Sequence, residues 1–150
     1  MEFVGNKNEA FASVLPATSK YPELKLSEFQ SVFNFLSNET EIGILQQAKV
    51  SRIKVHLELK DTIRPYSTLS ELSQERFGDE DSASTLYKQA IFALTASELV
   101  GIQMSTDATA EAADRQEALT HKKQHCDVQY RQAVDLLLNG RETYCFEVVQ

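Results

Sequence analysis

The segment that decides the fold is Ser82–Met104, with the sequence SASTLYKQAIFALTASELVGIQM. Apolar residues recur along it at helical spacing, and further apolar residues occupy the other faces. A helix that is apolar nearly all round is stable only when other elements cover it on most sides. We therefore expect this helix at the centre of an all-α domain. The apolar residues are Leu86, Ala90, Phe92, Ala93, Leu94, Leu99, Val100 and Ile102.

Two helices are predicted before this segment. The first runs from Ser27 to about Ser37, because Ser27 and Gln30 form an S-x-x-Q capping box at the helix start. The second runs from about Glu41 to Lys60, and the short link between them indicates an antiparallel hairpin. The residues of the first helix that share the spacing of one buried face are Phe29, Val32, Phe33 and Leu36.

The second predicted helix is apolar on two sides. One strip consists of Ile42, Val50, Ile53 and Leu57, and the other of Ile44, Leu45, Ala48, Val55 and Leu59. A basic line lies between the strips, at spacings that place its members on one face: Lys49, Arg52, His56 and Lys60. Such a line can lie in solvent, contact phosphate of DNA, or pair with acids of a neighbouring subunit such as Asp79, Glu80 and Asp81.

A connector over residues 61–81, with a short helical turn at Leu69 and Leu72, leads into the central helix. A long helix is predicted from Thr106 to Asn139, with Gly140 as its stop. An unbroken helix of this length spans roughly 45–50 Å, so we expect residues 108–118 to project from the domain. The stripe expected to dock comprises Leu119, Cys126, Tyr130, Ala133, Val134 and Leu137.

The two ends of the chain differ from the helical part. Residues 1–25 predict an extended N-terminal arm, residues 26–139 a helical domain, and residues 140–150 a C-terminal tail. In the tail, Tyr144, Phe146 and Val148 alternate with other residues at the period of a strand. No second strand is predicted to pair with it. The tail either folds back on its own core or docks on another chain, as a candidate partner-binding segment.

Composition limits the function classes. The chain has 150 residues, a single-domain length, and its 15 basic and 22 acidic residues give a net charge of −7, which argues against duplex binding as a primary role. Cys126 and Cys145 are too few for a disulfide framework, and no secretory signal is evident, so we expect a reduced, cytosolic setting with no membrane span.

Chemical motifs are scarce. No nucleophile elbow, P-loop or dinucleotide-binding glycine motif occurs, so we expect neither an enzyme nor a cofactor. His121 and His125 lie four residues apart and could ligate zinc, but the positive charges of Lys122 and Lys123 disfavour a cation. A solvated helix face without metal is the preferred interpretation.

The order of segments resembles the head completion protein L family of contractile-tailed bacteriophages. The resemblance covers roughly residues 15–150 and rests on the strings Tyr21-Pro-Glu-Leu-Lys-Leu-Ser-Glu-Phe, Tyr66-Ser-Thr-Leu-Ser-Glu-Leu, Leu86-Tyr-Lys-Gln-Ala-Ile-Phe-Ala-Leu, Asp107-Ala-Thr and Arg131-Gln-Ala-Val-Asp-Leu-Leu. It implies a four-helix, bundle-like adaptor with a long C-terminal helix.

The resemblance also implies a role. It suggests a virion protein of the head–tail neck, assembled in the host cytoplasm, that forms a ring, expected to be a dodecamer, on the portal protein. The ring extends the channel for double-stranded DNA and supports tail attachment, in contact with tail terminator or other neck proteins. A small helical cytoplasmic module that recruits a partner through its C-terminal strand is the alternative.

Overall fold

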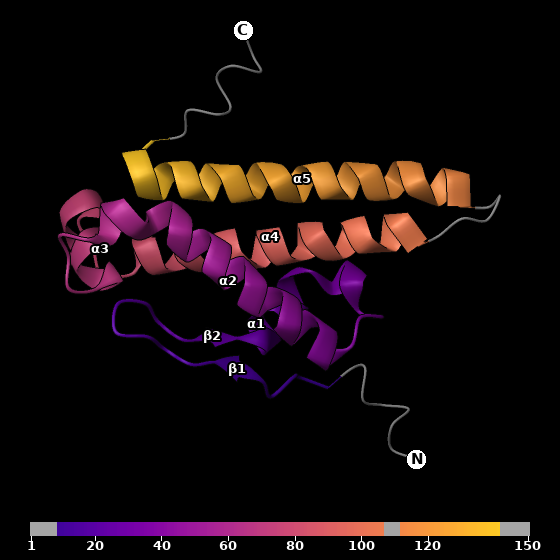
Figure 1. Cartoon of the computed structure of the whole chain (residues 1–150), viewed down its shortest axis with the longest axis horizontal. Helices are drawn as coiled ribbons and strands as arrows, with labels where there is room; N and C mark the ends of the chain where they lie inside the picture. Colours follow the sequence, from indigo (N-terminus) through magenta and orange to yellow (C-terminus); the bar gives the residue numbers. More distant parts are fainter. Residues whose placement is uncertain (1–8, 107–111, 142–150) are drawn as a thin grey trace, which may run out of the picture.

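The computed structural model describes residues 9–106 and 112–141. Most of these residues are helical, which confirms the all-α class (Figure 1). In chain order the elements are β1 (Val14–Leu15), β2 (Leu24–Lys25), α1 (Leu26–Val32), the 3-10 helix η2 (Asn34–Leu36), α2 (Glu41–Ile63), α3 (Leu69–Phe77), α4 (Ser82–Thr106) and α5 (Ala112–Asn139).

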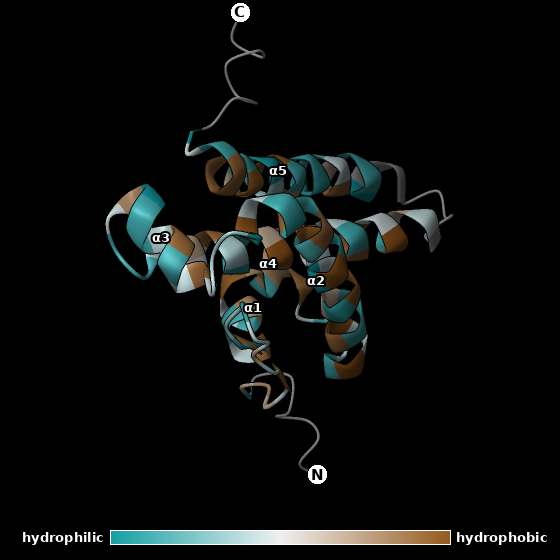
Figure 2. Cartoon of the chain, turned by 60° about the vertical axis from the view of Figure 1, so that its left-hand side comes forward, coloured by the Kyte–Doolittle hydropathy of each residue, from teal (hydrophilic) through white to brown (hydrophobic). Residues whose placement is uncertain are grey.

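The central position of α4 is confirmed. Helix α5 runs along it, α2 crosses it and also contacts α5, and α3 packs near its start (Figure 1). In Figure 2 the middle of α4, where other helices surround it, is largely hydrophobic in colour. Its side chains Tyr87, Ile91 and Val100 are fully buried, and only at its C-terminal end is a large apolar side chain, Ile102, exposed at 51%.

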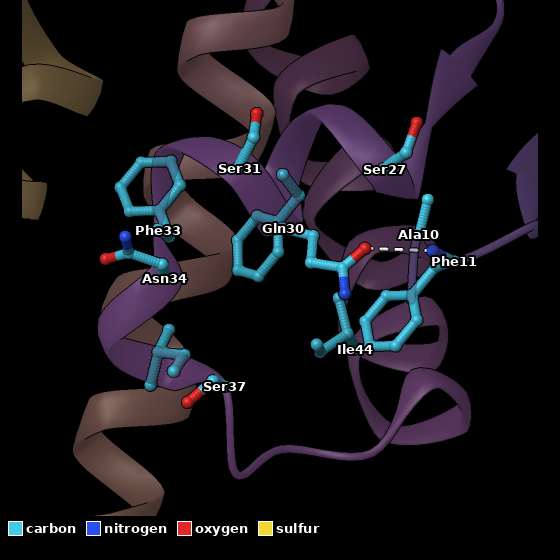
Figure 3. Close-up of a pocket in the computed structure, with 11 residues that line it drawn as sticks. Ala10, Phe11, Ser27, Gln30, Ser31, Phe33, Asn34, Ser37 and Ile44 are labelled. Atoms are coloured by element: carbon cyan, nitrogen blue, oxygen red, sulfur yellow. Dashed lines mark hydrogen bonds between the residues drawn. The ribbon is translucent and has the colours of Figure 1, made fainter. Parts of the chain in front are cut away.

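Helix α1 is shorter than predicted, and its capping box is wrong. The N-cap is Lys25, without a side-chain cap, because β2 leads directly into the helix and the N–H of Leu26 donates to the carbonyl of Ser13 at 3.1 Å. Gln30 instead binds the N-terminal segment: its Oε1 accepts from the N–H of Phe11 at 2.8 Å and its Nε2 donates to the carbonyl of Glu9 at 2.7 Å (Figure 3).

A break at Phe33 separates α1 from η2. Its backbone angles, φ −113° and ψ 52°, leave the helical region, so the predicted helix to Ser37 becomes two short pieces. Phe29, Phe33 and Leu36 are buried as predicted. Val32, which the helical spacing assigned to the same buried face, is instead 64% exposed.

The N-terminal segment packs on the helices from Phe11 onward. β1 and β2 form an antiparallel pair in which Leu15 faces Leu24, and both side chains are fully buried. This hairpin corrects the expectation that no strand lies upstream of the tail. Two-residue strands carry no detectable alternation in the sequence, so their position depends on burial rather than on periodicity.

Local capping fixes α2 and α3. Thr40 Oγ1 accepts from the N–H of Gly43 at 3.0 Å at the start of α2, which then extends to Ile63, three residues beyond the predicted end. Thr68 caps α3 in the same way, through the N–H of Glu71. Helix α3 ends at Gly78, whose φ of 82° a residue without Cβ adopts freely. The predicted helical turn is thus a complete short helix.

Helix α5 lies antiparallel to α4 along its length (Figure 1). The predicted stripe is confirmed: Cys126, Ala133, Val134 and Leu137 are buried, and Leu119 and Tyr130 are half-buried against the core. The start of α5 does not project alone, because α4 accompanies it and the carbonyl of Met104 accepts from Gln116 Nε2 at 2.9 Å. The two helices extend together past α2 (Figure 1).

Candidate interaction surfaces

The outer side of α2 carries exposed apolar residues. Of its two predicted strips, that of Ile44, Ala48, Val55 and Leu59 is buried, whereas Ile42, Ile53 and Leu57 are exposed at 80%, 61% and 66%. We name these three residues, with Lys49 and Lys60 beside them, the α2 face. Large apolar side chains grouped on one face of a rigid helix are typical of a surface that contacts another molecule.

The predicted basic line is divided between surface and interior. Lys49 and Lys60 are exposed and form no ion pair within the described part of the chain. Arg52 is half-buried, and its Nη1 donates to the carbonyl of Pro16 at 2.8 Å, which attaches the N-terminal segment to α2. His56 also lies partly inside. Two of the four predicted residues therefore remain available to a partner or to phosphate.

His56 belongs to an aromatic stack that the sequence analysis missed. Its ring lies 4.0 Å from that of Tyr21, and Tyr21 lies 4.8 Å from Tyr87, between ring centroids. His56 Nε2 and Tyr87 Oη share a hydrogen bond of 2.7 Å. The three residues come from the N-terminal segment, α2 and α4, so no sequence spacing could have indicated their contact.

The stack removes a positive charge from the basic line. Burial, together with the nearby charge of Arg52, lowers the pKa of His56 to about 4. Burial raises the pKa of Tyr21 to about 12, and that of Tyr87 is raised as well. At neutral pH all three rings are uncharged, which indicates that they join the N-terminal segment to the helices rather than bind an anion.

A second apolar surface is the groove between α1–η2 and α5, of about 310 Å³, which we name the α1–α5 groove. Val32 and Phe35, the latter 39% exposed, form one side. The lining residues on α5 are His121, Lys122, His125, Cys126 and Gln129. Sequence reasoning missed this groove because Val32 was assigned to the core.

Polar groups at the groove favour binding over catalysis. Lys122 Nζ lies 5.0 Å from the centroid of the Phe35 ring, and Gln129 Oε1 is buried without a hydrogen-bond partner among the described residues. Burial is the main cause that raises the pKa of Cys126 to about 11, which keeps the thiol protonated.

Metal binding has no support here. His121 and His125 are exposed, and residues 9–106 and 112–141 contain no cluster of three or more His, Cys, Asp or Glu side chains arranged for a metal ion. Two histidines alone leave a zinc ion short of protein ligands.

A cavity of about 350 Å³ lies between the N-terminal segment, α1 and η2 (Figure 3). Gln30 is directed into it and binds the backbone of Phe11 there. The other polar lining groups include Ser27, Ser31 and Asn34, none of which is a general base. This cavity therefore contributes to packing of the N-terminal segment and offers no evident chemistry.

The tail residues Tyr144, Phe146 and Val148 lie outside the described residues, so their predicted docking stays a prediction. Helix α5 ends at Asn139 and is followed by Gly140, whose φ is 73°. Arg141 is the last described residue. The C-terminal end of α5 is fixed by α3, because the guanidinium of Arg76 donates to the carbonyls of Leu137 and Leu138.

Comparison with known proteins identifies the family. A family model described as phage head completion protein (GPL) matches residues 17–148. Comparisons with curated proteins and with solved structures gave no significant match. Within the described part of the chain, no helix has the length and apolar character needed to cross a bilayer. The match begins after β1 and covers β2 and all the helices of the described chain, so the chain belongs to the phage head completion protein (GPL) family, a family of structural proteins of the phage head.

Proposed function

We propose that this protein is a connector that binds the portal vertex of a DNA-filled head as a ring and supports attachment of the tail after packaging. Its partners are the portal protein, further copies of itself, with a dodecamer the expected ring, and tail terminator or other neck proteins. It acts in the head–tail neck of the virion. The observation that carries this proposal is the exposed α2 face on a member of the head completion family.

The α2 face is suited to contact with a protein. Helix α2 is capped by Thr40 and buried along its opposite strip, so the exposed side chains have fixed positions. Preformed apolar surface binds without the cost of ordering a loop. Lys49 and Lys60 favour a partner with acidic residues. In a ring, the exposed acids Glu80 and Asp81 of a neighbouring copy can supply them.

The charge of the chain supports passage of DNA rather than its capture. The net charge is −7, and the structure withdraws Arg52 and His56 from the exposed basic line. Strong duplex binding requires several Lys or Arg contacts to phosphates. A ring of acidic subunits repels the duplex weakly along the channel, so that packaged DNA slides through it.

The test measures binding to portal-bearing heads. Purified chain with Ile53→Asp should bind such heads at least about tenfold more weakly than the wild type, because a carboxylate replaces an apolar side chain at the contact. Ile102→Asp, at an exposed apolar residue on α4, is the matched control and should bind normally. Melting temperatures of both variants show whether the fold is intact.

Sedimentation of heads with bound chain gives the stoichiometry. A ring requires a fixed ratio of copies to portal subunits. If the wild-type chain does not bind heads under any packaging state, the connector role is wrong, and a module that recruits another partner becomes the better explanation. Equal binding of Ile53→Asp and wild type would instead remove the α2 face from the contact.

A further inference from the structure

The α1–α5 groove has the features of a peptide-binding surface without an occupant in the described chain. Val32 and Phe35 expose apolar area in the groove. The buried ring of Phe33 and the buried thiol of Cys126 lie beside them. The buried Oε1 of Gln129 lacks a donor among the described residues. An unsatisfied buried acceptor costs about 1–3 kcal/mol, so a partner that brings an N–H group to it is favoured.

The C-terminal tail has the complementary chemistry. In residues 142–150, Tyr144, Phe146 and Val148 alternate with other residues, so an extended conformation presents one apolar side. An extended segment also offers free backbone N–H groups, one of which can donate to Gln129 Oε1 once that side chain rotates toward the groove. Glu142 and Glu147 are the charged residues of this stretch, while the rim of the groove carries Lys122.

We propose that the α1–α5 groove binds residues 142–150 of a second copy of this chain. The inference rests on the proposed ring, in which each copy has a neighbour on either side, and it names the contact that links them. Such an exchange is heterologous: the tail of one copy fits the groove of the next, which is the geometry that closes rings.

Chain length favours the groove of a neighbouring copy over the copy's own groove for the two aromatic residues. The nearest groove residue on α5, Gln129, lies twelve residues before Arg141, or about 18 Å along the helix at 1.5 Å per residue. Tyr144 follows Arg141 by three residues, and that backbone spans at most about 10 Å. The backbone of Phe146 reaches the level of Gln129 only near full extension, so a neighbouring groove accommodates the two aromatic residues together more readily.

The experiment uses a photoreactive residue in the full chain. Phe146 is replaced by p-benzoylphenylalanine, and this chain is mixed with an excess of unmodified chain labelled with nitrogen-15. After irradiation, mass spectrometry identifies the cross-linked peptides. Adducts on labelled peptides that contain Val32, Phe35 or Gln129 are expected, since these come from a second copy.

Matched variants of the labelled chain test the groove itself. Val32→Asp should reduce the yield of labelled adducts at least about tenfold, because it places a carboxylate in the apolar side of the groove. Ile102→Asp replaces a similarly exposed apolar residue outside the groove and should leave the yield of labelled adducts unchanged. Adducts on unlabelled groove peptides alone, on α2, or on no peptide would each overturn the proposal.

Head binding separates this inference from the proposed function. A chain that binds portal-bearing heads but gives no groove adducts retains its connector role and loses only the tail exchange. A chain that gives labelled groove adducts but does not bind heads forms tail-linked oligomers with a different purpose.

Discussion

The ring of His56 lies partly inside the protein and is uncharged at neutral pH. It stacks on Tyr21 and shares a hydrogen bond with Tyr87, and burial lowers its pKa to about 4 from an ordinary value of 6.5. The unfolded chain therefore binds a proton at His56 between pH 6.5 and 4, whereas the folded chain does not. Protonation favours the unfolded state, so the stability from this residue is complete above pH 6.5 and decreases as the pH falls through that window.

The stability of the chain should depend on pH through His56. Between pH 7 and pH 4.5, the free energy of unfolding should fall by about 1–2 kcal/mol less in His56→Gln than in the wild type, after allowance for partial exposure of the ring. Urea unfolding at several pH values measures this loss. His125→Gln, at an exposed histidine on α5, is the control and should keep the wild-type slope. Parallel slopes for wild type and His56→Gln would contradict the role of the stack.

At the scale of elements, Arg76 joins α3 to the C-terminal end of α5. Its guanidinium donates to the carbonyls of Leu137 and Leu138, which lack helical partners at that end. The positive charge also complements the negative end of the helix dipole. This one side chain therefore couples the short α3 to the long α4–α5 pair.

Arg76→Met should lower the free energy of unfolding by about 1.5–3 kcal/mol, since it removes charged hydrogen bonds to half-buried carbonyls. For a chain of this length the melting temperature should fall by about 3–10 °C. Thermal unfolding followed by circular dichroism measures the shift. Arg64→Met breaks an exposed pair with Asp61 and should shift the melting temperature by much less; an equal shift would show that Arg76 does not join the helices.

The elements that sequence reasoning predicted are those with local signals. Helices α2 and α4 carry sustained periodicity over more than six turns, and Gly140 marks the end of α5. Long-range contacts decided the rest. Gln30 contacts Phe11, nineteen residues away, so its capping role could not be judged locally. The N-terminal hairpin likewise depends on burial of Leu15 and Leu24 against distant helices.

Of the two candidate surfaces, the sequence predicted the α2 face but not the α1–α5 groove. The two apolar strips of α2 indicated that one would need a partner, and the structure leaves Ile42, Ile53 and Leu57 exposed. The α1–α5 groove was not predicted, because the helical spacing assigned Val32 to the buried face, whereas its side chain is exposed. The division of the basic line also depended on contacts with the N-terminal segment that no spacing reveals.

At the scale of the whole molecule, the described helices and the N-terminal segment share one hydrophobic core. The core residues run from Leu15 on β1 to Leu137 on α5. The C-terminal end of α5 is already closed by Gly140 and Arg76.

A chain truncated after Gly140 should retain its melting temperature within about 2 °C, because a tail that docks on a neighbouring copy, as proposed, contributes to association and not to the core of its own chain. It should also lose the self-association that depends on the tail. Calorimetry of dilute protein and sedimentation of concentrated protein measure the two quantities. A large fall in melting temperature would instead mean that the tail packs on its own core.

The attachment of β1 to α2 affects how copies of the chain behave at high concentration. Glu41 accepts from the N–H groups of Ala12 and Ser13 before the strand, and Arg52 donates to the carbonyl of Pro16 after it. Free backbone groups at a strand edge can join the sheets of two molecules into aggregates. Since ionic side chains bind the backbone on either side of β1, copies of the chain at high concentration are protected from edge-to-edge pairing at this strand.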